Sequence, residues 1–239
     1  SSDLGCGGNS DSGEGGSSSS ELRFVTGGES GTYYAYGTVL AQYSTNNAGV
    51  SVNALSSEGS KANIEALQNN EAELAFCQSD VTTYAYEGTS LFEGAPYQDF
   101  SVVASLYGEQ VQIVTCDPNI KTVADLKGKT VSIGAANSGV YFNAVDILGA
   151  YDMTEEDINA VYQNFADSAD SLKNDKIDAA FITAGAPTTA ISDLTTSKQA
   201  YLVSMDAEHI AKLQETSPYY AESTIPAGTY NAKIGRAHV

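Results

Sequence analysis

The sequence predicts an α/β protein made of two related halves. An apolar strand ends in a glycine-rich turn, and a helix begins at Thr32. The pattern of Ser, Gly, any residue and two aromatic residues recurs 108 positions after Gly31, at Gly139. Farther along, 67–76 and 172–181 match each other at an offset of 105. Two matches in the same order indicate a duplicated structural module.

Each copy of this module carries a helix with one apolar side. In both copies, four residues follow the i, i+3, i+4, i+7 spacing that marks a single face of a helix. We expect that face to be buried in both halves. Its residues are Tyr36, Val39, Leu40 and Tyr43 in the first copy, and Ala144, Ile147, Leu148 and Tyr151 in the second.

The first half consists of three successive strand–loop–helix units. After the first unit, an alternating strand at 50–55 precedes a helix that contains Ile64, and a strand at 74–77 precedes a helix that continues through Tyr84. Such units require a parallel sheet with right-handed crossovers, so their loops emerge at one sheet edge. Ligands of open α/β sheets bind at that edge.

The chain is expected to cross between the halves near two apolar runs, 102–107 and 111–115. Beyond them, 122–128 predicts a short helix with a capping-box start and a glycine stop. Pro187 suits the first turn of a later helix. These features divide the second half into further alternating units.

The charge of the chain limits its partners. The formal net charge is −19, and arginine occurs only as Arg23 and Arg236. Nucleic acids and anionic membrane surfaces are bound through lysine and arginine, so neither is expected as a partner. No run of about 18 apolar residues is present to span a bilayer.

The N-terminal residues are typical of a tether. Cys6 is followed by a Ser/Gly-rich tract that extends through Ser20, a composition that favours a flexible linker. A cysteine at the head of such a tract resembles the lipid-modified N-terminus of a bacterial lipoprotein. We therefore expect lipidation of Cys6, which would be the chain's only attachment to a membrane. Cys77 and Cys116 are expected to be small buried core residues.

Several motifs in order resemble a known family. They are Thr-Gly-Gly and Gly-Thr-Tyr-Tyr within 26–34, Ala-Phe and Gln-Ser-Asp-Val within 75–81, and the segment 122–139. Together they resemble the TAXI family, the extracytoplasmic solute-binding proteins of TRAP transporters, over most of 22–233. The resemblance implies a type II periplasmic-binding-protein fold, with two lobes of parallel or mixed sheet and a hinge. It also implies a monomer that delivers a glutamate-like amino acid or small carboxylate to TRAP permease membrane subunits.

The resemblance and the composition together suggest a domain organisation. In the family, a C-terminal segment returns to complete the first lobe, and we expect most of that segment to be missing here. The last six residues match a translated sequencing adapter. The expected parts are a tether at 1–20, lobe 1 at 21–107, lobe 2 at 108–205, a return segment toward lobe 1 at 206–233, and an artefact at 234–239.

A ligand site is expected where the two lobes face each other. The helix starts at Gly31 and Gly139 would converge there, and unpaired N–H groups at a helix start favour an anion. Aromatic rings would enclose the ligand, and hydroxyl and amide groups would orient it. Asp80 is interpreted as a solvated acid of a helix's first turn. The candidate ligand-binding residues are Gly28, Gly31, Thr32, Tyr33, Tyr34, Ser60, Gln78, Ser79, Gln110, Ser138, Gly139 and Gly185.

Catalysis is disfavoured by the residues present. Thr26 replaces the first glycine of the dinucleotide fingerprint, and the acidic residue expected about 20 positions later is missing. Histidine occurs only at His209 and His238, so no Ser/His/Asp set and no metal-ligand cluster can be assembled. We predict neither an enzyme nor a bound cofactor or metal.

Two other interpretations keep the same fold. One is an effector-sensing domain of a transcription regulator, but no basic helix-turn-helix segment precedes Leu22. The other is the binding protein of an ABC importer, which shares the architecture and remains the serious alternative to a TRAP partner.

Overall fold

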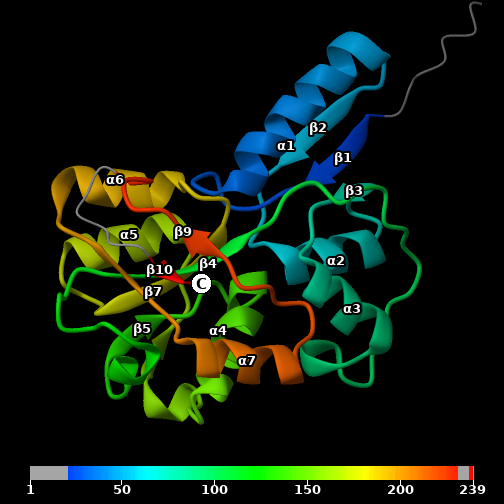
Figure 1. Cartoon of the computed structure of the whole chain (residues 1–239). Coiled ribbons are helices and arrows are strands. Elements are labelled where there is room, and N and C mark those ends of the chain that lie inside the picture. The colour runs from blue at the N-terminus through cyan, green and yellow to red at the C-terminus, as the bar shows by residue number, and fades with distance from the viewer. Residues whose placement is uncertain (1–20, 231–236, 239) are drawn as a thin grey trace, which may run out of the picture.

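The computed structural model describes residues 21–230 and 237–238, arranged around two main sheets (Figure 1). The first sheet is parallel in the order β2-β1-β3 and is accompanied by α1, α2 and α3. Its elements are β1 (Leu22–Val25), α1 (Thr32–Tyr43), a π-helical turn (Ser44–Ala48), β2 (Val52–Leu55), α2 (Ser60–Gln68), β3 (Leu74–Ala75), α3 (Ser79–Glu87) and a 3₁₀ turn (Ser90–Phe92). We call residues 21–107 the first lobe.

The second sheet has five strands in the order β6-β5-β7-β4-β8. Strand β5 is parallel to β6 and β7, whereas β4 is antiparallel to β7 and β8. The elements are β4 (Gln110–Thr115), β5 (Thr130–Ser132), α4 (Gly139–Ala150), β6 (Asn159–Val161), α5 (Phe165–Lys173), β7 (Ala179–Ala184), α6 (Thr189–Ser197), β8 (Tyr201–Val203) and α7 (Ala207–Thr216), with 3₁₀ turns at Val123–Leu126 and Glu155–Asp157. We call residues 108–230 the second lobe.

The two sheets repeat one topology, which confirms the predicted duplication. The order β2-β1-β3 in the first lobe corresponds to β6-β5-β7 in the second. Helices α1 and α4 each have 12 residues, and α2 and α5 each have 9. The fold is therefore the predicted α/β type, with two sheets that carry related strand–turn–helix units.

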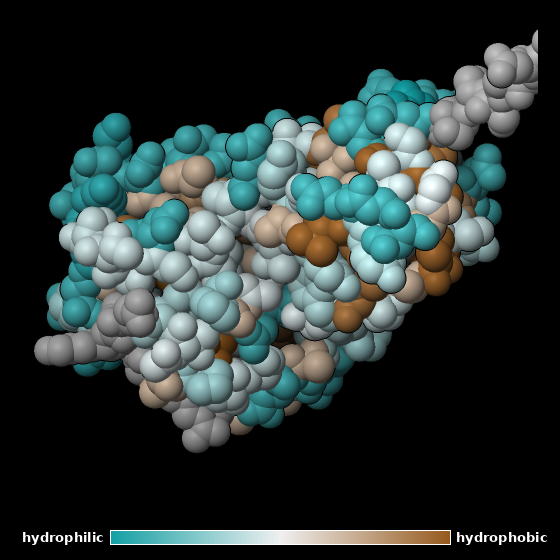
Figure 2. All heavy atoms as spheres, turned by 90° about the horizontal axis from the view of Figure 1, so that it is seen from above, coloured by the Kyte–Doolittle hydropathy of each residue, from teal (hydrophilic) through white to brown (hydrophobic). Residues whose placement is uncertain are grey.

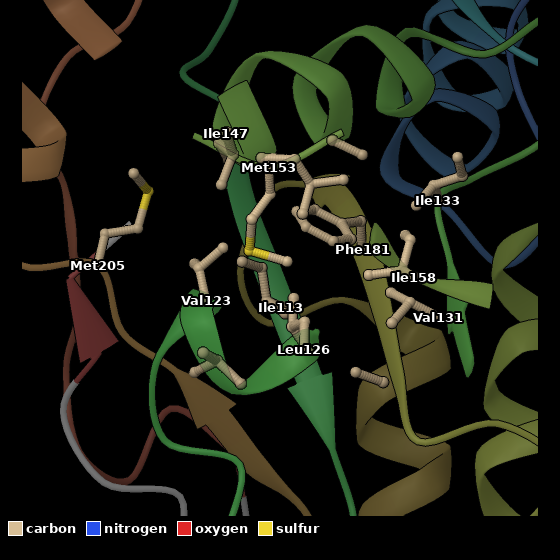
Figure 3. Packing of buried hydrophobic residues seen from close by; sticks show 14 of the residues in the cluster. Ile113, Val123, Leu126, Val131, Ile133, Ile147, Met153, Ile158, Phe181 and Met205 are labelled. Atoms are coloured by element: carbon tan, nitrogen blue, oxygen red, sulfur yellow. The ribbon is translucent and has the colours of Figure 1, made fainter. Parts of the chain in front are cut away.

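The second lobe contains the largest apolar core of the described chain. Side chains from β4, β5, β7 and α4 converge there with those from the 3₁₀ turn at Val123–Leu126 (Figure 3). Phe181 is fully buried at its centre, beside Ile113 and Val131. Each large apolar side chain buried in this way contributes about 1.5–3 kcal/mol. The second lobe is thus the better-packed scaffold.

The prediction that the first helix buries one apolar face is wrong for α1. Val39 is 59% exposed and Tyr43 is 66% exposed, whereas Ile147, the equivalent of Val39, is buried in α4 together with Leu148. Helix α1 instead approaches the turn after β1 at Gly37, where a Cβ would be 2.5 Å from the Thr26 methyl group. Hydrophobic atoms gather at the surface of the end that carries the first sheet (Figure 2). The small three-stranded sheet does not cover the whole helix.

The apolar run 102–107 is not a strand. Val102 is 73% exposed and Val103 is 87% exposed, and regular structure resumes only at Gln110. Within the described residues, β3 pairs only with β1, so 102–107 has no neighbouring strand to supply hydrogen bonds. Pro187 also differs from its predicted place, because it precedes the N-cap residue Thr188 of α6.

The segment 206–230 lies mainly on the second lobe. Ile210 and Leu213 of α7 join the core that contains α4, and Tyr230 joins a second cluster with β7 and α6. Contact with the first lobe comes from Tyr219, whose ring packs edge-on against Tyr84 of α3. In the described residues, β9 (Thr224–Ile225) pairs with β10 (Ala237–His238). The predicted tether at 1–20, including Cys6, and residues 231–236 and 239 lie outside the described chain.

No helix in the part of the chain that the structure describes has the length and apolar character needed to cross a membrane.

Candidate functional site

The starts of α1 and α4 both lie at the seam between the lobes. A Cβ on Gly31, before α1, would be 3.3 Å from the ring of Phe165 in the second lobe. A Cβ on Gly139, at the start of α4, would be only 1.4 Å from Oε1 of Gln78 in the first lobe. Each helix start is therefore covered by a side chain of the opposite lobe, and glycine is required at Gly139 for this contact.

Loops join the lobes beside the start of α4. The backbone N–H of Ala62 donates to the carbonyl of Asn137 at 3.0 Å. The side-chain amide of Asn137 donates to Glu58 at 3.0 Å, and Lys61 Nζ lies 3.4 Å from Asn137 Oδ1. Gly59 faces Ser138 with a φ of +119°, a conformation that strongly favours glycine. These contacts close one side of the seam.

Asn143 of α4 is the centre of the polar network between the lobes. Its Nδ2 donates to Asp80 Oδ2 at 3.0 Å and to the Tyr220 hydroxyl at 2.8 Å. Its Oδ1 accepts from Gln78 Nε2 and from Thr183 Oγ1, both at 2.8 Å. The amide's two hydrogens and two lone pairs are thus all used. Asp80 and Gln78 belong to the first lobe, and Thr183 and Tyr220 belong to the second.

Two buried carboxyl groups belong to this network. Asp80 is 4% exposed, and burial raises its pKa to about 6, against the hydrogen bonds that it accepts from Val81 N and Asn143. Burial likewise raises the pKa of Asp146. Asp146 accepts from the hydroxyls of Tyr220 and Tyr84 at 3.0 and 3.3 Å. Neither carboxyl group has a cationic partner among these contacts.

A large cavity begins at this network and extends along the first lobe. Its volume is about 1490 Å³, and it is lined by first-lobe residues, by the segment 99–111, by Asn143 and Thr183 of the second lobe, and by 219–223. The described residues around it include several carboxylates but no lysine or arginine. The polar end at Asn143 thus contrasts with the apolar side chains that line much of the rest.

Glu109 lies in this cavity among aromatic rings. It accepts a hydrogen bond from the Tyr33 hydroxyl at 2.8 Å, and the ring of Tyr33 meets that of Tyr107 edge-on at 6.5 Å. Burial, with a smaller contribution from the charge of Asp80, raises the pKa of Glu109 to about 8 against the hydrogen bond from Tyr33, which lowers it. The hydroxyl of Tyr107 is buried without a hydrogen-bond partner in the described residues.

A family model fits nearly the whole described chain. It is that of the NMT1-like family, and it matches residues 24–236. The chain belongs to the NMT1-like family.

Solved structures resemble this NMT1-like chain in fold. The alkanesulfonate-binding protein SsuA from Xanthomonas axonopodis pv. citri, bound to MOPS, is 20% identical with a TM-score of 0.52, covering 77% of this chain and 60% of its own length. The arginine-bound form of truncated ArgBP from T. maritima is 16% identical, with a TM-score of 0.53 and coverages of 83% and 94%. A substrate-binding protein of an amino acid ABC transporter is 16% identical, with a TM-score of 0.52 and coverages of 79% and 80%. The chain spans about three fifths of the alkanesulfonate-binding protein.

The structure divides the predicted site residues of this NMT1-like chain into three groups. Tyr33, Gln78, Ser79 and Gln110 line the cavity. A second group lies at the seam, where each residue takes part in a contact that joins or approaches the opposite lobe. Its members are Gly31, Thr32, Ser60, Ser138, Gly139 and Gly185. Gly28 supports the turn by accepting from Gly31 N at 2.9 Å, and the Tyr34 carbonyl accepts from Thr38.

Individual side chains differ from their predicted roles. Ser79 is exposed, and Gln110 donates to Ser223 at 2.7 Å. Ser138 occupies the N-cap position of α4 but donates to the Ala135 carbonyl rather than capping the helix. The interpretation of Asp80 as a solvated acid is wrong, because it is buried against Asn143.

Sequence reasoning missed Asn143, Glu109, Thr183 and Tyr220. Asn143 carried a usable signal, because it is an amide on a mostly apolar helix where it must find partners. Glu109 follows an apolar run in the sequence, and nothing local distinguishes it from a surface acid. No group of three or more His, Cys, Asp or Glu in the described residues is arranged to hold a metal.

Proposed function

We propose that this chain is an extracytoplasmic solute-binding protein that captures a small amino acid or carboxylate between its lobes. The observation that carries the proposal is the side chain of Asn143 beside the cavity, which makes four hydrogen bonds and so connects residues of both lobes. Membership of the NMT1-like family and the shared fold support it. The function is binding rather than catalysis: His209 lies away from the cavity, stacked on Tyr151.

Capture would depend on the balance between open and closed arrangements of the lobes. The network at Asn143 and the loop contacts at Asn137 stabilise the closed arrangement, each hydrogen bond by about 0.5–1.5 kcal/mol net. A solute that contacts both lobes adds to that stability, whereas one that contacts a single lobe does not shift the balance. Tyr33 and Tyr107 would supply the apolar enclosure that polar contacts alone cannot replace.

The transporter served is proposed to be of the TRAP type. The ordered motifs at 26–34, 75–81 and 122–139, which resemble the TAXI family, favour this partner over an ABC importer. An ABC importer with the same architecture is the alternative, and co-purification of the full-length protein with each kind of permease distinguishes the two. Lipidation of Cys6, measured by mass spectrometry of the membrane-derived protein, would establish the anchor.

A solute panel with a matched pair of variants tests the binding function. Amino acids, dicarboxylates and alkanesulfonates are screened by thermal shift, and hits are measured by calorimetry. Asn143→Ala removes four hydrogen bonds at the seam and should weaken a hit at least tenfold. Asn159→Ala, at an exposed position on β6, should leave the affinity unchanged. Equal affinities for wild type and Asn143→Ala would place the binding site elsewhere.

A further inference from the structure

We propose that the solute carries a positively charged nitrogen, an ammonium or guanidinium group, which lies between Glu109 and Asp80 and against the rings of Tyr33 and Tyr107. This inference rests on the proposed binding function and narrows its ligand class. It favours amino acids and amines over simple dicarboxylates and sulfonates.

The charges around the cavity support a cationic ligand group. Five acidic residues line it, and of these Glu73 is already paired with Arg23 at its outer end. Asp80 and Glu109 accept hydrogen bonds only from neutral groups, namely Asn143, the Val81 N–H and the Tyr33 hydroxyl. A buried, ionised carboxylate is destabilised unless it is paired with a cation or accepts several hydrogen bonds. No described lysine or arginine lines the cavity to serve as partner.

The aromatic groups beside Glu109 fit the same chemistry. Tyr33, Tyr36 and Tyr107 gather with Phe76, and their ring centroids lie 5.0–6.5 Å apart. Faces of aromatic rings attract ammonium and guanidinium groups, most strongly where water is excluded. The buried hydroxyl of Tyr107 lacks a partner in the described residues and lies on the cavity lining, where a ligand atom can hydrogen-bond with it.

A ligand with only negative charge fits this end of the cavity poorly. Its carboxylates would approach Asp80, whose pKa of about 6 leaves it largely ionised at neutral pH, and like charges at close range repel strongly in a buried site. The helix starts that favour anions are covered, that of α1 by Phe165 and that of α4 by Gln78. A carboxylate of a zwitterionic solute can still reach the start of α4 if Gln78 moves aside.

The test uses five probes of defined charge: L-arginine, L-lysine, putrescine, L-glutamate and succinate. Calorimetry should show saturable binding of at least one amine-bearing probe and none of succinate. Glu109→Gln should weaken that binding at least tenfold. Asp193→Asn, which removes an exposed carboxylate of α6 that does not line the cavity, should change it less than twofold. Circular dichroism confirms that both variants are folded.

A pH series separates a direct charge contact from a packing effect. Glu109 faces Tyr33 of α1, Cys77, Asp80 of α3 and Tyr107, and its pKa of about 8 leaves it largely protonated below neutrality. Binding of a cation requires the ionised form, so affinity should rise about tenfold or more from about pH 6 to about pH 9 and a proton should be released. Glu109→Gln should reduce this dependence to about twofold, the change expected from Asp80, whose pKa is about 6.

The outcomes distinguish this inference from the function on which it rests. Binding of succinate that Asn143→Ala weakens would retain the binding function and overturn the cationic ligand. Amine binding that is unaffected by Glu109→Gln would overturn the assigned position. Failure of every amine-bearing probe to bind would overturn the inference, and failure of the wider solute panel as well would overturn the binding function.

Discussion

Gly139→Ala tests whether the seam contacts control ligand binding. The added methyl group would be 1.4 Å from Gln78 Oε1, whereas ordinary contacts are 3.4–4 Å, so the Gln78 side chain must move by about 2 Å. That movement breaks the hydrogen bond from Gln78 to Asn143 and weakens its contact with Ser60. Only the bond to Asn143 joins the lobes, and its loss destabilises the closed arrangement by about 0.5–1.5 kcal/mol. Ligand affinity should therefore fall about 2- to 12-fold.

The assay is calorimetry with the best ligand, combined with small-angle scattering to follow lobe separation. Gly149→Ala is the matched control, because it lies on the same helix with nothing within 4 Å of its added Cβ. It should preserve affinity and stabilise α4 by about 0.5–1 kcal/mol. The double variant Gly139→Ala, Gln78→Ala relieves the clash, so its loss should be smaller than the sum of the single losses. Wild-type affinity for Gly139→Ala, or strict additivity, would refute the reasoning.

Three further predictions follow from buried groups. Glu109→Gln should raise the free energy of unfolding by about 2–4 kcal/mol at about pH 8 and leave it nearly unchanged at about pH 5. The reason is that folding raises the carboxyl pKa from 4.5 to about 8, so the wild-type folded state loses stability as pH rises through that window. Denaturant titrations at the two pH values measure this difference. Asp80→Asn should flatten the smaller loss of stability between about pH 4 and 6, and a slope like wild type would contradict the assigned burial. Gly37→Ala should destabilise the first lobe by about 1–3 kcal/mol because its Cβ would meet Thr26 at 2.5 Å, and a melting temperature equal to that of wild type would show that α1 is free to shift.

The sequence predicts the fold better than it predicts burial. Strand, turn and helix repeat at fixed offsets, and these local signals indicate the strand–turn–helix units that form the sheets β2-β1-β3 and β6-β5-β7 in the structure. Burial depends on what covers each element. The same spacing therefore gives a buried stripe at Ile147 and an exposed one at Val39, because the second lobe has five strands and α7 around its helix.

The sequence indicates where the two lobes meet but not which residues form the candidate site. The glycine turns correctly indicate the seam, since Gly31 and Gly139 each meet the opposite lobe. The network itself joins Asp80, Asn143 and Tyr220, which are separated by more than 60 residues in sequence. Such pairings depend on the docking of the two lobes, and no local pattern contains that information.

The unequal packing of the lobes gives the seam a second consequence. The second lobe holds the larger cores, whereas the first lobe has a three-stranded sheet and an exposed face on α1. Local openings should therefore begin in the first lobe. The contacts from Asn143 to Gln78 and Asp80 attach α3 to the better-packed lobe, so a ligand that strengthens the seam must also slow hydrogen exchange in α1, α2 and α3. Exchange in β4 and β7, which are already buried, should change little, and this contrast identifies binding at the seam whichever solute is bound.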